Sequence, residues 1–122
     1  MDIGIDFDGV IVAEEWPEIG ELLPGAAYAI RAIKAAGHRV VIATCRMGDP
    51  EAKAKEFLVT NNIPFDAFNE NFADRTERYG GDCRKISADL YIDDRNLGGF
   101  PGWGSVLDAL HLLPPQAWGD VG

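Results

Sequence analysis

The chain has 122 residues, of which 47% are hydrophobic, and this predicts a single globular domain over residues 1–122 with one hydrophobic core. Its formal net charge of −9 argues against nucleic acid as a partner, because sequence-independent nucleic-acid binding relies on Lys and Arg. The N-terminus lacks a basic segment followed by an apolar one, and no apolar run approaches the ~20 residues of a membrane helix, so we expect a cytoplasmic protein without a membrane span.

The first third of the chain predicts a strand, a loop and a helix. Residues 2–7 form an apolar run that is short enough for a strand. Residues 10–22 are irregular, with glutamates and a proline, and are expected to form a loop or a short flap over the strand end. Residues 25–36 are rich in alanine and carry apolar residues at helical spacing, and Gly37 is well placed to end this helix.

The middle of the chain predicts two strands and a second helix. Residues 39–43 are a β-branched run that is too short for a helix. A helix is expected over residues 49–61, with Asp49 as its cap and a proline in its first turn. Residues 65–68 form a short third strand, and residues 69–84 are polar and are expected to be a loop.

The C-terminal third predicts a strand over residues 88–92, a glycine-rich turn over 98–104 and a helix over 104–113. Strands that alternate with helices indicate an α/β protein of three layers, in which a parallel sheet has helices on both faces. In such sheets, ligands bind beyond the carboxyl ends of the strands.

Acidic and hydroxyl side chains follow three of these strands. Asp6 and Asp8 end the first strand, Thr44 ends the second, and Asp93 and Asp94 end the fourth. Because the carboxyl ends of parallel strands meet at one edge of the sheet, we expect these residues to converge. A few carboxylates with retained waters are typical of magnesium sites, so the pattern predicts bound Mg²⁺ with ligands among the four aspartates.

The same residues resemble the motifs of the haloacid dehalogenase superfamily of phosphohydrolases, and the resemblance covers nearly the whole chain. It implies a Rossmann-like sheet of order 3-2-1-4, with strands numbered along the chain, and a magnesium-dependent phosphatase. The segments between the motifs are too short for a cap domain, so the chain resembles a small, capless branch of the superfamily. The motifs are Asp6-Phe7-Asp8-Gly9-Val10, Val41-Ile42-Ala43-Thr44, Lys85 and Asp93-Asp94.

The resemblance assigns the chemistry to the first acid pair. Asp6 is the expected nucleophile, which forms an aspartyl-phosphate and so divides one difficult displacement into two easier ones. Asp8 is expected to be the general acid for the leaving oxygen and then the base that activates water, and its backbone carbonyl is expected to bind the metal. For the acid role Asp8 must hold a proton, which neighbouring anions would favour.

The remaining site residues are expected to contact the phosphoryl group or the metal. Thr44 can donate its hydroxyl to a phosphoryl oxygen, and Lys85 can contribute a positive charge there. Of the late acids, Asp94 is favoured as the direct metal ligand and Asp93 as its support. Arg46 is a candidate for a second anionic group of the substrate.

Each of these assignments has a structural alternative. Lys85 also fits a solvated lysine in a loop, and Arg46 fits an ordinary surface ion pair at least as well as a substrate contact. Trp16 and Trp103 are interpreted as packing residues. The two cysteines, Cys45 and Cys83, lack zinc or disulfide spacing and are interpreted as buried hydrophobes.

At the level of function, the sequence predicts a phosphomonoesterase with an open site for a small or bulky phosphorylated substrate, which a homo-oligomer can help to close. The alternative is a phospho-accepting or metal-binding regulatory module with little turnover.

Overall fold

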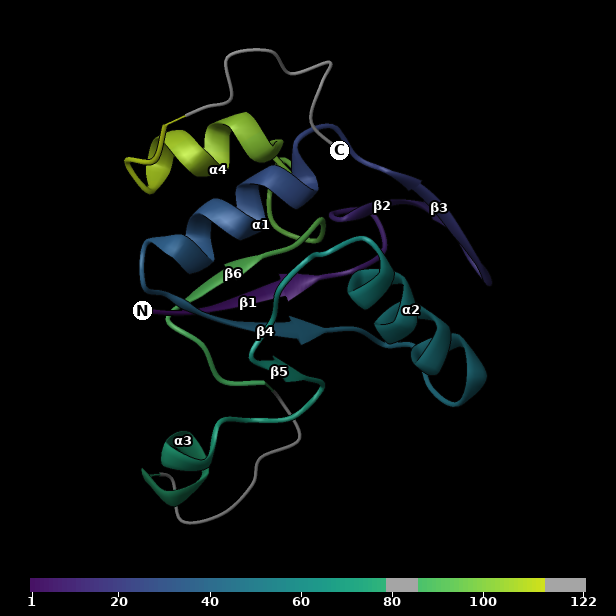
Figure 1. Cartoon of the computed structure of the whole chain (residues 1–122), viewed down its shortest axis with the longest axis horizontal. Coiled ribbons are helices and arrows are strands. Elements are labelled where there is room, and N and C mark those ends of the chain that lie inside the picture. The colour runs from purple at the N-terminus through teal and green to yellow at the C-terminus, as the bar shows by residue number, and fades with distance from the viewer. Residues whose placement is uncertain (79–85, 114–122) are drawn as a thin grey trace.

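The fold is built on a parallel β-sheet and a separate β-hairpin. The computed structural model describes residues 1–78 and 86–113. Within them, a parallel sheet has the order β5-β4-β1-β6, and an antiparallel pair joins β2 to β3 (Figure 1). This confirms the predicted α/β class with a parallel sheet. The elements are β1 (Asp2–Asp6), β2 (Val12–Glu15), β3 (Glu18–Leu22), α1 (Ala26–Ala35), β4 (Arg39–Ala43), α2 (Asp49–Thr60), β5 (Ala67–Phe68), α3 (Ala73–Arg78), β6 (Leu90–Ile92) and α4 (Trp103–Ala109).

One face of the sheet packs against α1, α2 and α4. Side chains alternate between the two faces along a strand, and Ile3 and Ile5 of β1 are fully buried on this face. They share one hydrophobic core with Ile30 of α1, Leu58 of α2 and Leu107 of α4. Full burial of an aliphatic side chain stabilises a fold by about 1.5–3 kcal/mol, so this core holds the strand ends in register.

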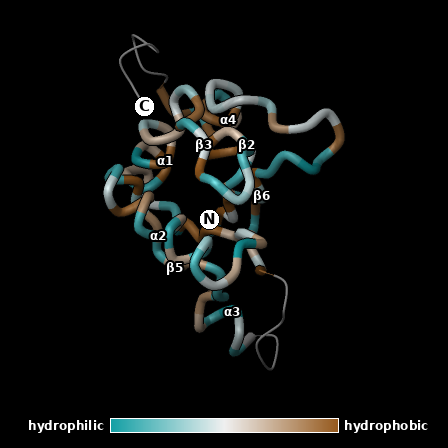
Figure 2. Tube along the Cα trace, turned by 90° about the vertical axis from the view of Figure 1, so that its right-hand side faces the viewer, coloured by the Kyte–Doolittle hydropathy of each residue, from teal (hydrophilic) through white to brown (hydrophobic). Residues whose placement is uncertain are grey.

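The opposite face of the sheet carries polar residues and the short helix α3. Asp2 points to this face, and its carboxylate accepts a hydrogen bond of 2.6 Å from Nε of Arg75 in α3. Gly4 lies beneath the ring of Tyr91, which a Cβ at this glycine would approach to 3.2 Å. Helix α3 lies at the far end of the molecule from α1 and α4 in both views (Figures 1 and 2).

The two long helices form where the sequence predicts them. In α1 the stripe that includes Ile30 and Ile33 is buried, and Gly37 follows its last turn with φ of 95°. Helix α2 begins at Asp49, but the preceding cap position is Gly48, and the Asp49 side chain lies inside the first turn instead of capping it. None of the helices in the described part of the chain is both long and apolar enough to cross a membrane.

Two segments that were predicted as a loop or a flap contain regular structure. The whole β2–β3 hairpin lies within residues 10–22, beside the strand ends, so it fits the predicted short flap and not a loop. The loop prediction was wrong for residues 73–78, which form α3, and residues 79–84 lie outside the described residues. The hairpin strands have four and five residues and two glutamates each, and α3 spans only six residues, so neither carries a long apolar pattern that predicts its regular structure.

The tryptophans and cysteines differ in their surroundings. Trp103 is 2% exposed and its Nε1 donates a hydrogen bond of 2.8 Å to the Val10 carbonyl, as expected of a packing residue. Trp16 is 55% exposed. Cys45 is exposed, so its interpretation as a buried hydrophobe was wrong. Cys83 lies outside the described residues.

Candidate functional site

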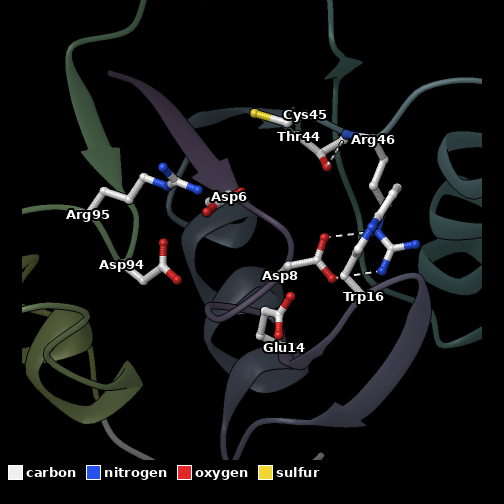
Figure 3. Close-up of a pocket in the computed structure, with 9 residues that line it drawn as sticks. All are labelled: Asp6, Asp8, Glu14, Trp16, Thr44, Cys45, Arg46, Asp94 and Arg95. Atoms are coloured by element: carbon white, nitrogen blue, oxygen red, sulfur yellow. Dashed lines mark hydrogen bonds and ion pairs between the residues drawn. The ribbon is translucent and has the colours of Figure 1, made fainter.

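A pocket of about 320 Å³ opens at the carboxyl edge of the parallel sheet. Strand β1 ends there with Asp6, Thr44 follows β4, and Asp94 follows β6. Because β4, β1 and β6 are neighbours in the sheet, residues from distant parts of the sequence meet at this edge (Figure 3). The pocket is lined by Asp6, Asp8, Glu14, Trp16, Thr44, Cys45, Arg46, Asp94 and Arg95.

Asp6 is the partly buried carboxyl of this pocket. Burial raises its pKa to about 6, and the charge and hydrogen bonding of Asp94 and the charge of Asp8 act in the same direction. The backbone N–H of Phe7 donates a hydrogen bond of 2.8 Å to Asp6 Oδ1 and opposes the rise. Asp6 is therefore a carboxylate that is held among other anions, an arrangement that a bound cation would stabilise.

The turn after β1 brings Asp94 against the backbone of Gly9. Gly9 has φ of 83°, and its N–H donates a hydrogen bond of 2.7 Å to the Val12 carbonyl. A Cβ built on Gly9 would collide with Oδ2 of Asp94. The backbone angle favours a glycine here, and any side chain would also have to push the Asp94 carboxylate out of its position.

If Asp94 is a Mg²⁺ ligand, Gly9→Ala should displace its carboxylate and weaken Mg²⁺ binding, measured by calorimetric titration, by about tenfold or more. Both the strained backbone angle and the collision should also destabilise the fold, by about 1–3 kcal/mol. Gly98→Ala is the matched control, because Gly98 has φ of 86° but open space at its Cβ position. Equal effects of the two substitutions on Mg²⁺ affinity would show that Asp94 is not a ligand.

Asp8 and Arg46 form a two-point ion pair in this pocket. Nε of Arg46 donates a hydrogen bond to Asp8 Oδ2, and Nη2 donates one to Asp8 Oδ1, both of 2.8 Å. Such a planar contact binds the carboxylate form of an aspartate. The expected acid role of Asp8 needs a proton and a free oxygen, so Asp8 must leave Arg46 to perform it.

Arg46 is an internal residue and not the surface arginine that the sequence suggested. The residue is 2% exposed, and its guanidinium also donates to the carbonyls of Pro17 and Glu18 at 3.0 and 2.8 Å. Its Cζ lies 5.0 Å from the centre of the Trp16 ring. The surface ion pair that was the alternative interpretation is thus replaced by a buried one, and the guanidinium is surrounded by partners from this chain.

Thr44 is held in the pocket by Asn69. The Thr44 backbone N–H donates a hydrogen bond of 2.8 Å to Asn69 Oδ1, and the Asn69 amide in turn donates one of 2.6 Å to Glu51. The Thr44 Oγ1 accepts a hydrogen bond of 3.1 Å from the Arg46 backbone N–H, which leaves its own proton for another acceptor. Asn69 was not predicted as a site residue, although it directly follows β5 as Thr44 follows β4.

The two late acids, which are adjacent in the turn after β6, line different cavities. Asp94 lines the pocket with Asp6 and Asp8, whereas Asp93 lines a neighbouring cavity, and its Oδ1 accepts a hydrogen bond of 3.1 Å from the Arg95 backbone N–H. Lys85 lies outside the described residues. Four lining residues were not among the predicted site residues: Glu14, Trp16, Cys45 and Arg95.

The pair of Asp6 and Asp94 is the part of the pocket that suits a divalent cation. The two carboxylates interact closely enough for Asp94 to raise the pKa of Asp6. The described residues contain no group of three or more His, Cys, Asp or Glu side chains that could hold a metal ion. Mg²⁺ is compatible with this smaller set, because it retains waters and accepts backbone oxygens besides one or two carboxylates.

Fold and site together define an α/β protein with an acidic pocket at the carboxyl edge of its parallel sheet. No protein-family model and no curated protein matches the chain. Among solved structures, a conserved protein from Bacteroides thetaiotaomicron is 36% identical to it, with a TM-score of 0.82. The match covers 91% of this chain and 89% of that protein. The chain therefore belongs to the same family as this conserved Bacteroides protein.

Proposed function

We propose that the protein is a magnesium-dependent phosphomonoesterase that acts through an aspartyl-phosphate on Asp6. The observation that carries the proposal is the meeting of Asp6 with Asp94 in one pocket beside Thr44, from three separate strand ends. A carboxylate nucleophile, a second carboxylate for the metal and a hydroxyl donor are the parts that phosphoryl transfer through an aspartate requires.

In the proposed reaction, Asp6 attacks phosphorus and the ester oxygen departs with a proton from Asp8. Asp8 then accepts a proton from the attacking water, which releases phosphate and restores the Asp6 carboxylate. Thr44 donates its hydroxyl to a phosphoryl oxygen, as Lys85 is expected to do with its ammonium group. Asp6, Asp94 and the Asp8 carbonyl, with Asp93 in support, would hold Mg²⁺, which would supply positive charge to offset repulsion among the anions.

The resemblance to the haloacid dehalogenase superfamily supports the same function. On this proposal the domain is Rossmann-like and capless. The sheet order β5-β4-β1-β6, with three helices packed on one face, supports the Rossmann-like arrangement. The open pocket then accepts either a small or a bulky phosphorylated substrate, and association with a second copy would help to exclude water. We expect the protein to act in the cytoplasm.

The proposal is tested by phosphate release from an aryl phosphate at pH 7, with Mg²⁺ or with a chelator in its place. We expect steady turnover that depends on Mg²⁺, and the same dependence across a panel of nucleotides and sugar phosphates. Absence of phosphate release from every ester, with Mg²⁺ present, would exclude the phosphomonoesterase.

A regulatory module that accepts phosphate with little turnover is the second candidate. It is favoured by one observation: both carboxylate oxygens of Asp8 are engaged by the buried Arg46, so that Asp8 is not free to activate water. Intact-protein mass spectrometry after incubation with acetyl phosphate and Mg²⁺ separates the two. Persistent phosphorylated protein without phosphate release would support the module, and rapid loss of the adduct would support the phosphatase.

A further inference from the structure

The β2–β3 hairpin forms one wall of the pocket. Glu14, at the end of its first strand, and Trp16, in its turn, both line the pocket (Figure 3). The hairpin is an antiparallel ribbon of only two strands, paired at Val12 with Leu22 and at Glu15 with Glu18. An isolated two-stranded ribbon is marginally stable in water, so its position over the site must depend on contacts with the rest of the fold.

Val12, Ile19 and Leu22 of the hairpin pack on the hydrophobic core, and Arg46 supplies further contacts at the hairpin turn. It comes from the loop after β4, 28 to 29 residues away from the two hairpin carbonyls that it binds, and it also lies over the Trp16 ring. The other edge of the same guanidinium holds Asp8, 38 residues away in sequence. The Phe7 ring lies 5.4 Å from the Arg46 Cζ. One buried side chain thus joins Asp8 to the hairpin.

We propose that Arg46 is a positioning residue that couples the β2–β3 hairpin to the carboxylate of Asp8. In this arrangement Asp8 provides the charge that keeps the guanidinium buried, and the guanidinium in turn holds the hairpin turn over the pocket. The substrate-facing wall that carries Glu14 and Trp16 is therefore assembled through Asp8. Arg46 serves the site by this link and not by gripping a second anion of the substrate.

The geometry favours Arg46 as a positioning residue over Arg46 as a substrate ligand. Arg46 makes four hydrogen bonds of 2.8–3.0 Å to groups of this chain, and its side chain is 1% exposed. A substrate anion would have to displace the Asp8 carboxylate to reach it. Loss of one partner from a buried, hydrogen-bonded charge pair leaves the other charge uncompensated, so the hairpin contacts should weaken when Asp8 loses its charge.

The test is amide hydrogen exchange of the hairpin, followed by mass spectrometry in the protein without substrate. Asp8→Asn keeps the shape of the side chain but removes the charge, and we expect hairpin amides within residues 14–20 to exchange at least about tenfold faster, while β1 and β4 stay protected. Asp6→Asn is the matched control, since it makes the same change two residues away without touching Arg46. Unchanged hairpin exchange in Asp8→Asn would overturn the link.

Arg46→Lys gives an independent measurement, because lysine keeps the charge but cannot make the forked contact. We expect faster hairpin exchange in this variant too. Arg95→Lys, which changes another arginine of the same pocket, is the control, and an equally large increase in its hairpin exchange would overturn the proposal. In active protein, whose assay rests on the proposed function, Arg46→Lys should lower kcat about tenfold or more with KM changed less than about threefold. A raised KM with unchanged hairpin exchange would make Arg46 a substrate ligand. The exchange measurement needs no turnover, so the link can fail or hold separately from the phosphatase.

Discussion

Asp6→Asn is expected to abolish phosphate release and at the same time to stabilise the metal-free protein. On the proposed role of Asp6 as the nucleophile, its removal should lower kcat by at least about a thousandfold. The structural effect has the opposite sign, because burial and Asp94 raise the pKa of Asp6 to about 6. A carboxyl whose pKa is higher in the folded than in the unfolded state costs stability once it ionises, and the neutral amide removes this cost.

The pH dependence gives the sign of this prediction a separate check. The cost of ionised Asp6 begins above its unfolded pKa of 3.8 and is complete above about pH 6. With a chelator present, we expect Asp6→Asn to increase the free energy of unfolding at pH 7.5 by on the order of 1–2 kcal/mol and to leave it unchanged below pH 4. Added Mg²⁺ should reverse the order by stabilising the original protein more than the variant.

Asp8→Asn is the matched comparison, and we expect it to lower the free energy of unfolding. The same exchange of carboxylate for amide, two residues along, leaves the buried Arg46 without its charged partner. Thermal unfolding of the two variants side by side measures the difference. If both variants are destabilised at pH 7.5 without metal, the carboxylate repulsion inferred around Asp6 is absent.

The sequence contains the information for the strand ends because each is a local pattern. A β-branched or apolar run that stops at an acid or a hydroxyl predicts both a strand and a candidate site residue at its end, as it does for Asp6 and Thr44. Alternation with helices then predicts the parallel sheet, and the parallel sheet brings the ends to one edge. These steps depend on neighbouring residues and on general topology alone.

The paired strands of the hairpin and the helix α3 could not be predicted because tertiary contacts stabilise them. The hairpin turn is bound by Arg46 across 28 residues, and α3 is joined to the sheet through Arg75 and Asp2, which are 73 residues apart. Sequence spacing does not reveal which arginine meets which acid. The orientation of Asp8 toward Arg46 was missed for the same reason, since a turn residue can direct its carboxylate to either side.

Asp2→Asn is expected to lower the free energy of unfolding by about 3 kcal/mol and the melting temperature by roughly 10 °C. The Asp2 side chain is 9% exposed and accepts hydrogen bonds of 2.6–2.7 Å from Arg39 and Arg75. These bonds hold the pKa of Asp2 near 2, and the Arg39 contact is the larger cause. An amide in its place leaves Arg39 with only Asp74 and Arg75 with only Asp89 as charged partners, and both of these carboxylates are far more exposed than Asp2.

Acid titration distinguishes this charge effect from a simple loss of packing. Because the pKa of Asp2 is lower in the folded protein, its contribution is present above the unfolded pKa of 3.8 and disappears as pH falls through about 2. The stability difference between the original protein and Asp2→Asn should therefore shrink over that interval. Asp74→Asn is the control, since Asp74 binds the same Arg39 but is 62% exposed, and an exposed pair contributes about 1 kcal/mol or less. A loss in Asp74→Asn as large as that in Asp2→Asn would mean that burial does not set the strength of this network.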